Sequence, residues 1–568
     1  MKLFFYCFFF LSIFTQAQEY PKNYFGPPMD IPLNLSGNFA ELRNNHFHAG
    51  IDIKTKGITG IPIIAVADGY ISRIKIQWHG YGKVLYINHP NGYTSVYGHL
   101  ERFGTKIQQF IHQKQYQKQS YALDEELDST VIYVKKGEII AYSGNTGGSG
   151  GPHLHFEIRD TKSEVAINPL LFGFAIKDDI PPSIQGIKIF PLNPHSFVNY
   201  KNSPQYFPTI FRDNMYTIAS VPKVHGTIGL GVQTNDILNG NHNKCGVYDI
   251  QLEINEQKIY QFTADKIPFD ESKYINAHTD YEGRMRDGRW VHRNYILPNN
   301  QLKNYPLHKN NGVINCTTNE EKKVHYSIAD VYGNTSVITF KIESYEKTDF
   351  PIICLSDHFK LYFKYDKKNK YKDSIIHIEI PAFALYEDIE FEFNVVPNPT
   401  HDKSKIFKIH HSYTPLHMPY RVGMKVPDYL KNNKDKIVVI RKDVHQHKKI
   451  IPTYIVKDSL FFMTNLFGDF TLHLDTKGPF ISGVDIKNGS NLSGKSKFTL
   501  QIEDNLSGIK EYNAWVNGKW ILLEYEYKNK TLIHYFDGEI PAGAKHDLKV
   551  EAKDHVGNTS SFSCSFVY

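Results

Sequence analysis

The residues best suited to chemistry lie where a glycine-rich loop runs into a pair of histidines, in the sequence GNTGGSGGPHLHFEIR of residues 144–159. The residues after the loop alternate as they do in a strand. Side chains two residues apart in a strand point to the same side, so His153 and His155 should project from one face of a sheet. Neutral imidazole is the commonest side-chain metal ligand, and the pair is therefore a candidate metal site.

A second cluster lies upstream in the sequence NHFHAGIDI, where His48 and Asp52 are four residues apart. Catalytic zinc sites use three protein ligands and leave the fourth position to water or substrate, whereas structural sites close with four ligands and are often rich in cysteine. No cysteine occurs in residues 18–244, so a cysteine-based structural site is excluded there. The residue types predict a three-ligand site made of His48, Asp52 and either His153 or His155.

Several separately spaced motifs resemble, in their order, those of the lysostaphin/LytM-type zinc metallopeptidases. They are HAGIDI (48–53), AVADG (65–69), GYG (80–82), YGHL (97–100), GNTG (144–147) and GPHLHFE (151–157). The resemblance extends over residues 40–172, about a quarter of the chain. It implies an antiparallel β-sheet peptidase domain of the duplicated hybrid motif type and a Zn²⁺ cofactor.

The resemblance also implies a role for each site residue. His48, Asp52 and His155 match the family's zinc ligands, while His99 and His153 match its two catalytic histidines, which contact the attacking water and the developing oxyanion. Zinc lowers the pKa of bound water and polarises the scissile carbonyl. One histidine can accept the water proton and pass it to the leaving amine, and a second can donate a hydrogen bond to the oxyanion.

The function that this resemblance implies is zinc-dependent hydrolysis of peptide bonds in peptidoglycan stem peptides or cross-links. The alternative is a non-catalytic envelope protein whose LytM-like domain binds or activates another cell-wall hydrolase. Family members of that kind typically lose zinc ligands, and this chain has all of them. A third possibility, a secreted protease acting on glycine-rich proteins, shares the mechanism and differs in substrate.

The remaining histidines carry weaker signals. We expect a structural or substrate-edge role for His46, a place in the groove wall for His79 and a structural role at a hairpin turn for His89. The pairs at 410–411 and 445–447 lie in charged segments without a glycine loop or a carboxylate partner. We expect both pairs to be solvated.

The N-terminus predicts export. Met1 and Lys2 precede an apolar run over residues 3–14, and a small residue follows at Ala17, which together indicate a signal peptide over residues 1–17. The run is too short to span a membrane, and no later stretch reaches 18 apolar residues. We therefore expect a soluble periplasmic or envelope-associated protein. The net charge of +6 is too mild for nucleic-acid binding, and we expect peptidoglycan and envelope proteins as partners.

The rest of the chain contains an internal sequence repeat. The sequence IADVYGNTS before residue 337 matches EAKDHVGNTS before residue 561, and upstream of these Asp236 echoes Asp504. Each copy starts near a linker, at Pro181-Pro182 or Gly478-Pro479. Regularly spaced short strands with turn signals between them are typical of β-sandwiches, so the repeat predicts two immunoglobulin-like domains.

The fold class is therefore expected to be mainly β. After the signal peptide we expect a peptidase domain over 18–175 with a polar helical insertion at 101–136, where the family usually has a short hairpin. An Ig-like sandwich over 176–345, a β-rich module over 346–475 and a second Ig-like sandwich over 476–568 complete the chain.

Four cysteines remain in the mature chain, Cys245, Cys316, Cys354 and Cys564. An even number in an oxidising compartment permits disulfides. Cys245 and Cys316 could form one within a single domain.

Overall fold

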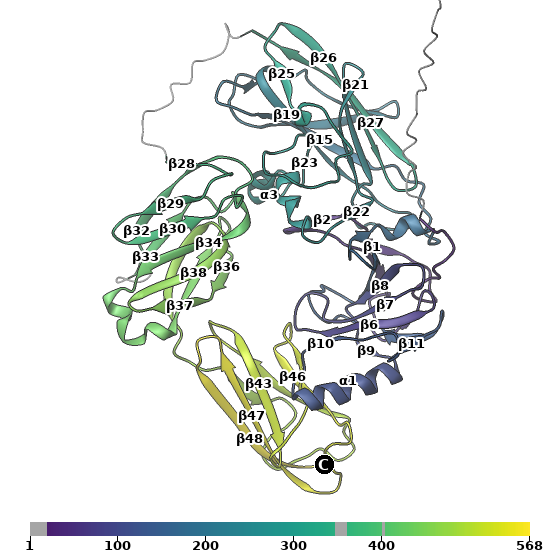
Figure 1. Cartoon of the computed structure of the whole chain (residues 1–568), viewed down its shortest axis with the longest axis vertical. Helices are drawn as coiled ribbons and strands as arrows, with labels where there is room; N and C mark the ends of the chain where they lie inside the picture. The colour runs from purple at the N-terminus through teal and green to yellow at the C-terminus, as the bar shows by residue number, and fades with distance from the viewer. Residues whose placement is uncertain (1–19, 347–360, 400–403) are drawn as a thin grey trace, which may run out of the picture.

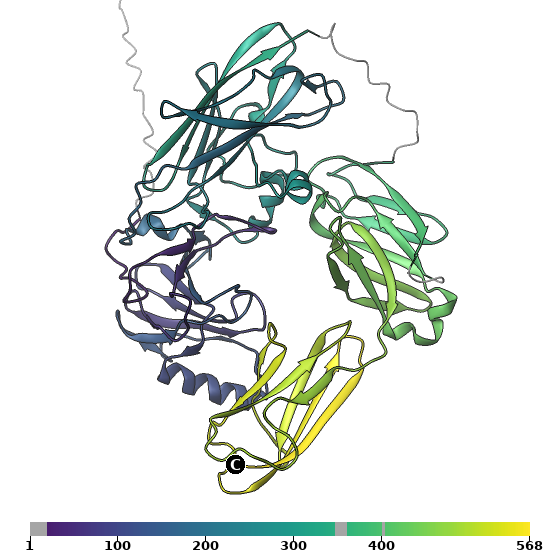
Figure 2. The ribbon, with the colours of Figure 1, turned by 180° about the vertical axis from the view of Figure 1, so that it is seen from behind.

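The computed structural model describes residues 20–346, 361–399 and 404–568. The predicted signal peptide and Cys354 lie outside the described residues. The described chain is mainly β, which confirms the expected fold class. Figures 1 and 2 show β-rich modules that follow one another around a ring, so that the C-terminal module lies beside the N-terminal one.

The N-terminal module is built on an antiparallel sheet. Its strands run in the order β1 (Leu35–Gly37), β4 (Ile51–Lys54), β13 (His153–Asp160), β8 (Tyr93–Gly98), β7 (Lys83–Asn88), β6 (Gly69–Ile76) and β10 (Leu123–Glu126). On β13 the apolar side chains of Leu154, Phe156 and Ile158 are buried in the core. The alternation of a strand then places His153 and His155 on the opposite face.

A smaller sheet and one helix complete this module. The sheet is β5 (Pro62–Ile64), β12 (Ile139–Tyr142) and β9 (Arg102–Phe103), and the helix is α1 (Thr105–Lys118). The helix lies within the segment 101–136, where the sequence predicts a polar helix. It buries Ile107, Ile111 and Gln115, spaced four residues apart on one face, and its other side chains are exposed or half-buried.

The second module contains a 12-stranded sheet. Its main order is β16 (Phe197–Val198), β19 (Lys223–Asn235), β15 (Ser183–Pro191), β17 (Gln205–Arg212), β18 (Met215–Ile218), β27 (Thr335–Ser344), β26 (Glu320–Ala329), β20 (Asp249–Ile254), β21 (Gln257–Thr263) and β24 (Leu307–His308), and β23 (His292–Arg293) and β25 (Ile314–Cys316) also pair with β19. Short helices follow β21 at η2 (Ser272–Tyr274), α2 (Ile275–His278) and α3 (Tyr281–Asp287). Cys245 and Cys316 are free and buried, so the disulfide suggested for them is wrong.

The third and fourth modules each contain two larger sheets. In the third module, the first sheet has the order β29 (Asn369–Lys372), β30 (Ile376–Ile380), β34 (Pro415–Lys425), β38 (Ser459–Leu466) and β37 (Thr453–Val456). The second sheet has the order β32 (Phe393–Pro397), β33 (Lys405–Ile409), β39 (Gly468–Leu474), β35 (Ile437–Lys442) and β36 (Lys448–Ile451). In the fourth module, the first sheet has the order β40 (Phe480–Gly483), β42 (Lys497–Glu503), β46 (Thr531–Tyr535) and β45 (Glu524–Glu526). The second sheet has the order β41 (Ser490–Asn491), β48 (Thr559–Val567), β47 (Lys545–Asp554), β43 (Ile509–Val516) and β44 (Lys519–Trp520). Each module encloses its own apolar core.

Hydrogen bonds join each module to the next around the ring. In order they include Asn38 Nδ2 to Gly246 O at 2.7 Å, Asn299 Nδ2 to Leu385 O at 2.7 Å, Lys436 Nζ to Val556 O at 2.9 Å, and the ring-closing ion pair of Lys83 Nζ with Glu524 at 2.8 Å. None of the helices in the described part of the chain has the length and apolar character needed to cross a bilayer.

Candidate metal centre

Strand register brings the predicted ligands together. Residue 155 on β13 lies directly opposite Asp52 on β4, and His48 precedes β4 in the same corner. Asp52 Oδ1 lies 3.1 Å from His48 Nε2 and 2.9 Å from His155 Nδ1, and these two nitrogens are 3.0 Å apart. All three side chains are buried. His153 Nε2 lies farther away, 3.5 Å from Asp52 Oδ1, so His155 completes the group of three.

The outer hydrogen bonds of the two imidazoles decide which nitrogen faces the corner. His48 Nδ1 donates to the Asn38 carbonyl at 2.7 Å, and His155 Nε2 donates to Glu157 Oε1 at 2.8 Å. The lone pairs of His48 Nε2 and His155 Nδ1 therefore converge on the Asp52 carboxylate. Tetrahedral zinc with bonds of about 2.0–2.1 Å separates its ligand atoms by ~3.3 Å, close to the distances here. The donor set fits a zinc ion with a fourth position open.

The electrostatics of the corner favour positive charge. Burial alone would lower the pKa of His155, but its hydrogen bonds to Asp52 and Glu157 raise that pKa to about 9. Burial would raise the pKa of Asp52, yet the imidazoles of His48, His153 and His155 hold it well below its usual value. Burial lowers the pKa of His48 to about 4, so this ligand stays neutral. The buried Asp52 carboxylate, beside the neutral imidazole of His48, thus stabilises a positive charge in this corner, either a proton on His155 or a metal ion.

Behind His155 lies a buried row of charged side chains on the same strand face. Glu157 Oε2 accepts a hydrogen bond from Arg159 Nε at 2.7 Å, and the Tyr81 hydroxyl donates to Glu157 Oε1. Burial would raise the pKa of Glu157, but Arg159 and His155 lower it to about 2. The row fixes the ring of His155, as carboxylates commonly do behind a metal-binding histidine. The sequence analysis missed the pair of Glu157 and Arg159, although the alternation of HLHFEIR places both residues on the strand face of His155.

Arg43 fixes the other side of Asp52. It comes from the hairpin of β2 (Leu42–Arg43) and β3 (His46–Phe47), and its guanidinium pairs with Asp52 Oδ2 and, at 3.4 Å, with Glu41. Asp52 Oδ1 is thereby left facing the two histidines. No sequence pattern pointed to Arg43.

His99 and His153 stand beside the three candidate ligands, with ring centroids 4.8 Å apart. His99 Nδ1 donates to the Thr146 carbonyl and His153 Nδ1 to the Gly151 carbonyl, both at 2.8 Å, which leaves each Nε2 unprotonated. Burial, and then the neighbouring imidazoles of His155 and His153, lower the pKa of His99 to about 3. His99 has a φ of 60°, a left-handed conformation that costs a non-glycine residue on the order of 1–3 kcal/mol.

The glycine motifs hold these two histidines in place. Gly147 has a φ of 70°, and a Cβ added there would lie 2.3 Å from the amide nitrogen of Gly82. The GNTG and GYG motifs therefore pack backbone to backbone, which only glycine permits. Thr146, next to Gly147, donates to the Leu100 carbonyl at 2.8 Å, and its own carbonyl orients His99.

Other histidines lie outside this corner. His89 is buried and bonded to the Asp68 carbonyl and the Ser95 hydroxyl, in agreement with a structural role. The exposed His46 bonds only to the nearby Asn44 carbonyl. The His79 ring lies 4.3 Å from that of Tyr527, in the fourth module.

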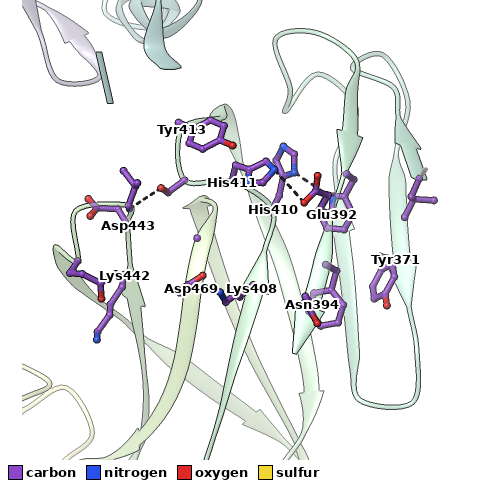
Figure 3. Close-up of a pocket in the computed structure, with 17 residues that line it drawn as sticks. Tyr371, Glu392, Asn394, Lys408, His410, His411, Tyr413, Lys442, Asp443 and Asp469 are labelled. Carbon is purple, nitrogen blue, oxygen red and sulfur yellow. Dashed lines mark hydrogen bonds and ion pairs between the residues drawn. The ribbon is translucent and has the colours of Figure 1, made fainter. Parts of the chain in front are cut away.

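The 410–411 pair lines a cavity of about 680 Å³ in the third module (Figure 3). His411 faces Glu392 at 3.4 Å, and burial followed by the charge of His411 lowers the pKa of His410 to about 3. The pair is therefore less solvated than expected. His445 and His447 are exposed. Neither pair belongs to a group of three candidate metal ligands in the described residues.

Comparisons with known proteins agree with this geometry. Residues 46–116 and 112–169 match the family described as peptidase family M23, and residues 360–475 match the Zu5-like domain. A metalloprotease of Haemophilus influenzae is 36% identical over 123 residues, 22% of this chain and 20% of that protein. The DD-carboxypeptidase/endopeptidase Mpg of Neisseria meningitidis is 36% identical over 118 residues, 21% of each chain.

More distant similarities include lysostaphin of Staphylococcus simulans, 27% identical over 160 residues, which are 27% of this chain and 25% of that one. Among solved structures, the catalytic domain of the M23 protein EnpA from Enterococcus faecalis is 25% identical over 27% of this chain and 95% of that one, with a TM-score of 0.19.

The N-terminal part of the chain is thus a zinc metallopeptidase domain, as the sequence motifs predict. Residues 46–169 match the model of peptidase family M23, and lysostaphin is among the proteins that this part of the chain is similar to. The chain spans about a fifth of the length of the curated relatives it matches first.

Proposed function

We propose that the protein is a zinc-dependent endopeptidase that hydrolyses peptide bonds in the stem peptides or cross-links of peptidoglycan. The proposal rests on one observation: the lone pairs of His48 Nε2, Asp52 Oδ1 and His155 Nδ1 converge beside two further imidazoles, those of His99 and His153. The substrate class is supported by relatives whose names are lysostaphin, glycyl-glycine endopeptidase ALE-1 and DD-carboxypeptidase/endopeptidase Mpg.

In this proposal His48, Asp52 and His155 hold the ion, and bound zinc polarises the scissile carbonyl and lowers the pKa of water. His99 and His153 each present an unprotonated Nε2 toward the reacting atoms. An imidazole in this state accepts the proton of the attacking water and then delivers it to the leaving amine. The second imidazole, protonated on Nε2 by solvent before the attack, would donate a hydrogen bond to the oxyanion. The carbonyls of Thr146 and Gly151 keep both rings oriented throughout.

We also propose the cellular setting and the later domains. A signal peptide over residues 1–17 would direct the chain to the periplasm or the envelope. The peptidase domain would occupy 18–175, followed by Ig-like modules at 176–345 and 476–568 around the β-rich module at 346–475. The repeated sequence and the strand-rich modules support this division. The later modules would bind envelope proteins or position the enzyme.

The function can be tested on the full mature chain, loaded with one equivalent of zinc. We expect soluble muropeptides from purified sacculi, identified by mass spectrometry, and no release after zinc removal. Glycine-rich proteins should be cut slowly or not at all. A zinc-loaded chain that leaves sacculi from several bacteria intact but cuts glycine-rich proteins would favour the secreted protease. Inactivity on both substrates would favour the non-catalytic envelope protein.

A further inference from the structure

Three carboxylates meet at the junction between the first and second modules. Asp178 lies in the linker before β15, Asp236 follows the end of β19, and Asp330 follows the end of β26. One oxygen from each lies within 4.8 Å of the others, and all three residues line one small cavity together with Tyr332 and Tyr248. Residues far apart in sequence thus direct negative charge toward a single point.

The same arrangement recurs between 224 and 297 residues later in the chain. Asp475 lies in the linker before β40, Asp504 follows β42, and Asp554 ends β47, and these three also lie within 4.8 Å of one another. The second group occupies the positions of the first within the repeated sequence. Two modules of one chain therefore contain the same acidic cluster.

An asparagine supports the third aspartate of each cluster in the same way. Asn334 Nδ2 donates to Asp330 Oδ2 at 2.7 Å and to the Asp178 carbonyl at 3.2 Å. Asn558 Nδ2 donates to Asp554 Oδ2 at 2.6 Å and to the Asp475 carbonyl at 2.9 Å. The linker is thereby tied to the Asp-x-x-Gly-Asn turn in both modules.

The clusters contain buried oxygens that no hydrogen bond satisfies. Asp236 is only 2% exposed and Asp475 only 1%, and the Oδ1 atom of each is buried without a hydrogen-bond partner. Burial, followed by the charges of Asp178 and Asp330, raises the pKa of Asp236 to about 7. An unpaired buried carboxylate is costly unless a charge or a metal compensates it.

No protein cation supplies that compensation. In the described part of the chain no lysine, arginine or histidine lies within ion-pair distance of any of the six carboxylates. Such acidic clusters of pure oxygen donors contrast with the peptidase corner, where two of three donors are nitrogen.

We propose that each aspartate triad binds one Ca²⁺ ion and that the ion fixes the angle between neighbouring modules. Oxygen donors in irregular geometry suit calcium, whereas magnesium demands a near-ideal octahedron and gives up its waters reluctantly. Zinc prefers nitrogen and sulfur ligands. Because Asp178 and Asp475 belong to linkers, a bound ion ties each linker to the strand ends of the module that follows. The two ions would stiffen the ring of modules.

Calcium titration of the full mature, zinc-loaded chain tests this directly. Isothermal titration should give two calcium ions per chain, one for each triad. Asp236→Asn and Asp504→Asn should each retain one site and the double variant none, with the zinc content unchanged by elemental analysis. Asp213→Asn, which alters an exposed carboxylate in the β17–β18 turn, is the matched control and should retain both.

Limited trypsin digestion of the wild type, with and without calcium, gives a readout of the linkers that does not depend on any variant. Lys177 and Lys477 are exposed beside the two triads. Calcium at ten times its Kd should slow cleavage there about tenfold in the wild type, and each variant should lose protection at its own linker. The absence of calcium binding by the wild type, unchanged stoichiometry in the variants, or equal protection by magnesium would each overturn the assignment.

Discussion

The candidate metal corner and the two segments beside it are held in place in opposite ways. These segments, called the rim here, are the β2–β3 hairpin and the glycine loop of residues 144–151. The corner draws His48, Asp52 and His155 from two adjacent strands and the loop before one of them, all within 110 residues. The rim is held by distant modules. Phe47 N on the β2–β3 hairpin donates to Ser272 Oγ of the second module at 3.0 Å, and Lys528 of the fourth module donates to the Asn145 carbonyl. The candidate ligands are thus close in sequence, whereas the two rim segments are held by contacts with later modules.

Helix α1, within the insertion at 101–136, contacts the fourth module beside the glycine loop. Tyr116 and His112 on α1 share Asp537 Oδ2, at 2.6 and 2.9 Å. Once docked there, the fourth module places the Tyr527 hydroxyl 3.4 Å from the Gly147 carbonyl, on the loop that carries the site glycines. The helix is therefore a platform for a later module.

The largest expected effect comes from breaking the corner. Replacing His155 by alanine removes one of three ligands and leaves Glu157 without its imidazole partner. We expect His155→Ala to lose nearly all bound zinc and all measurable release of muropeptides. Elemental analysis and a sacculus assay provide the two measurements, and His195→Ala, at an exposed histidine of the second module, is the control. Normal zinc in His155→Ala would show that the ligand assignment is mistaken.

A smaller effect on activity is expected from replacing His99 or His153, which lie beside the candidate ligands. His99→Ala and His153→Ala remove no proposed ligand, so both variants should keep one zinc. Turnover should fall by ~10²–10⁴-fold if the residue moves protons, or by ~10²–10³-fold if it stabilises the oxyanion. A variant with wild-type kcat would assign its histidine a purely structural role.

The smallest effect is expected at the rim itself. Lys528→Ala removes contacts from the fourth module to the carbonyls of Asn145 and Ser149. A contact of this kind is worth about 1 kcal/mol, so amide exchange in residues 144–151 should accelerate roughly fivefold. Hydrogen exchange with mass spectrometry measures this, and zinc content should not change. Lys530→Ala, which breaks an exposed pair with Glu503, is the control. Equal exchange in both variants would mean that the ring does not restrain the loop.

Much of the site was predictable because its determinants are short-range. Alternation along a strand places residues 153 and 155 on one face, and ordered motifs identified the family. The backbone turns needed glycine at positions such as Gly82 and Gly147, and the sequence displays them directly. Within the polar segment 101–136, residues Thr105–Lys118 form a helix, although its contact with the fourth module was not visible in the sequence.

The residues that were missed act through partners that no local pattern reveals. Arg43 reaches Asp52 from a separate hairpin, and the Glu157–Arg159 pair depends on burial between strands. The disulfide suggested for Cys245 and Cys316 failed because cysteine count carries no information on geometry. Likewise, the aspartates of each triad lie up to 152 residues apart and meet only when a linker and two strand ends converge.

The sequence by itself determined the class of protein, the zinc-binding residue types and the repeat, since each is encoded by residue identity and spacing. The motif resemblance also assigned His155 as the third ligand, whereas the tertiary structure alone decided which ring nitrogens face the corner and which modules contact the rim. Those features depend on strand register and on contacts between residues hundreds of positions apart. Such contacts arise from the packing of whole modules, and no window of sequence contains both partners.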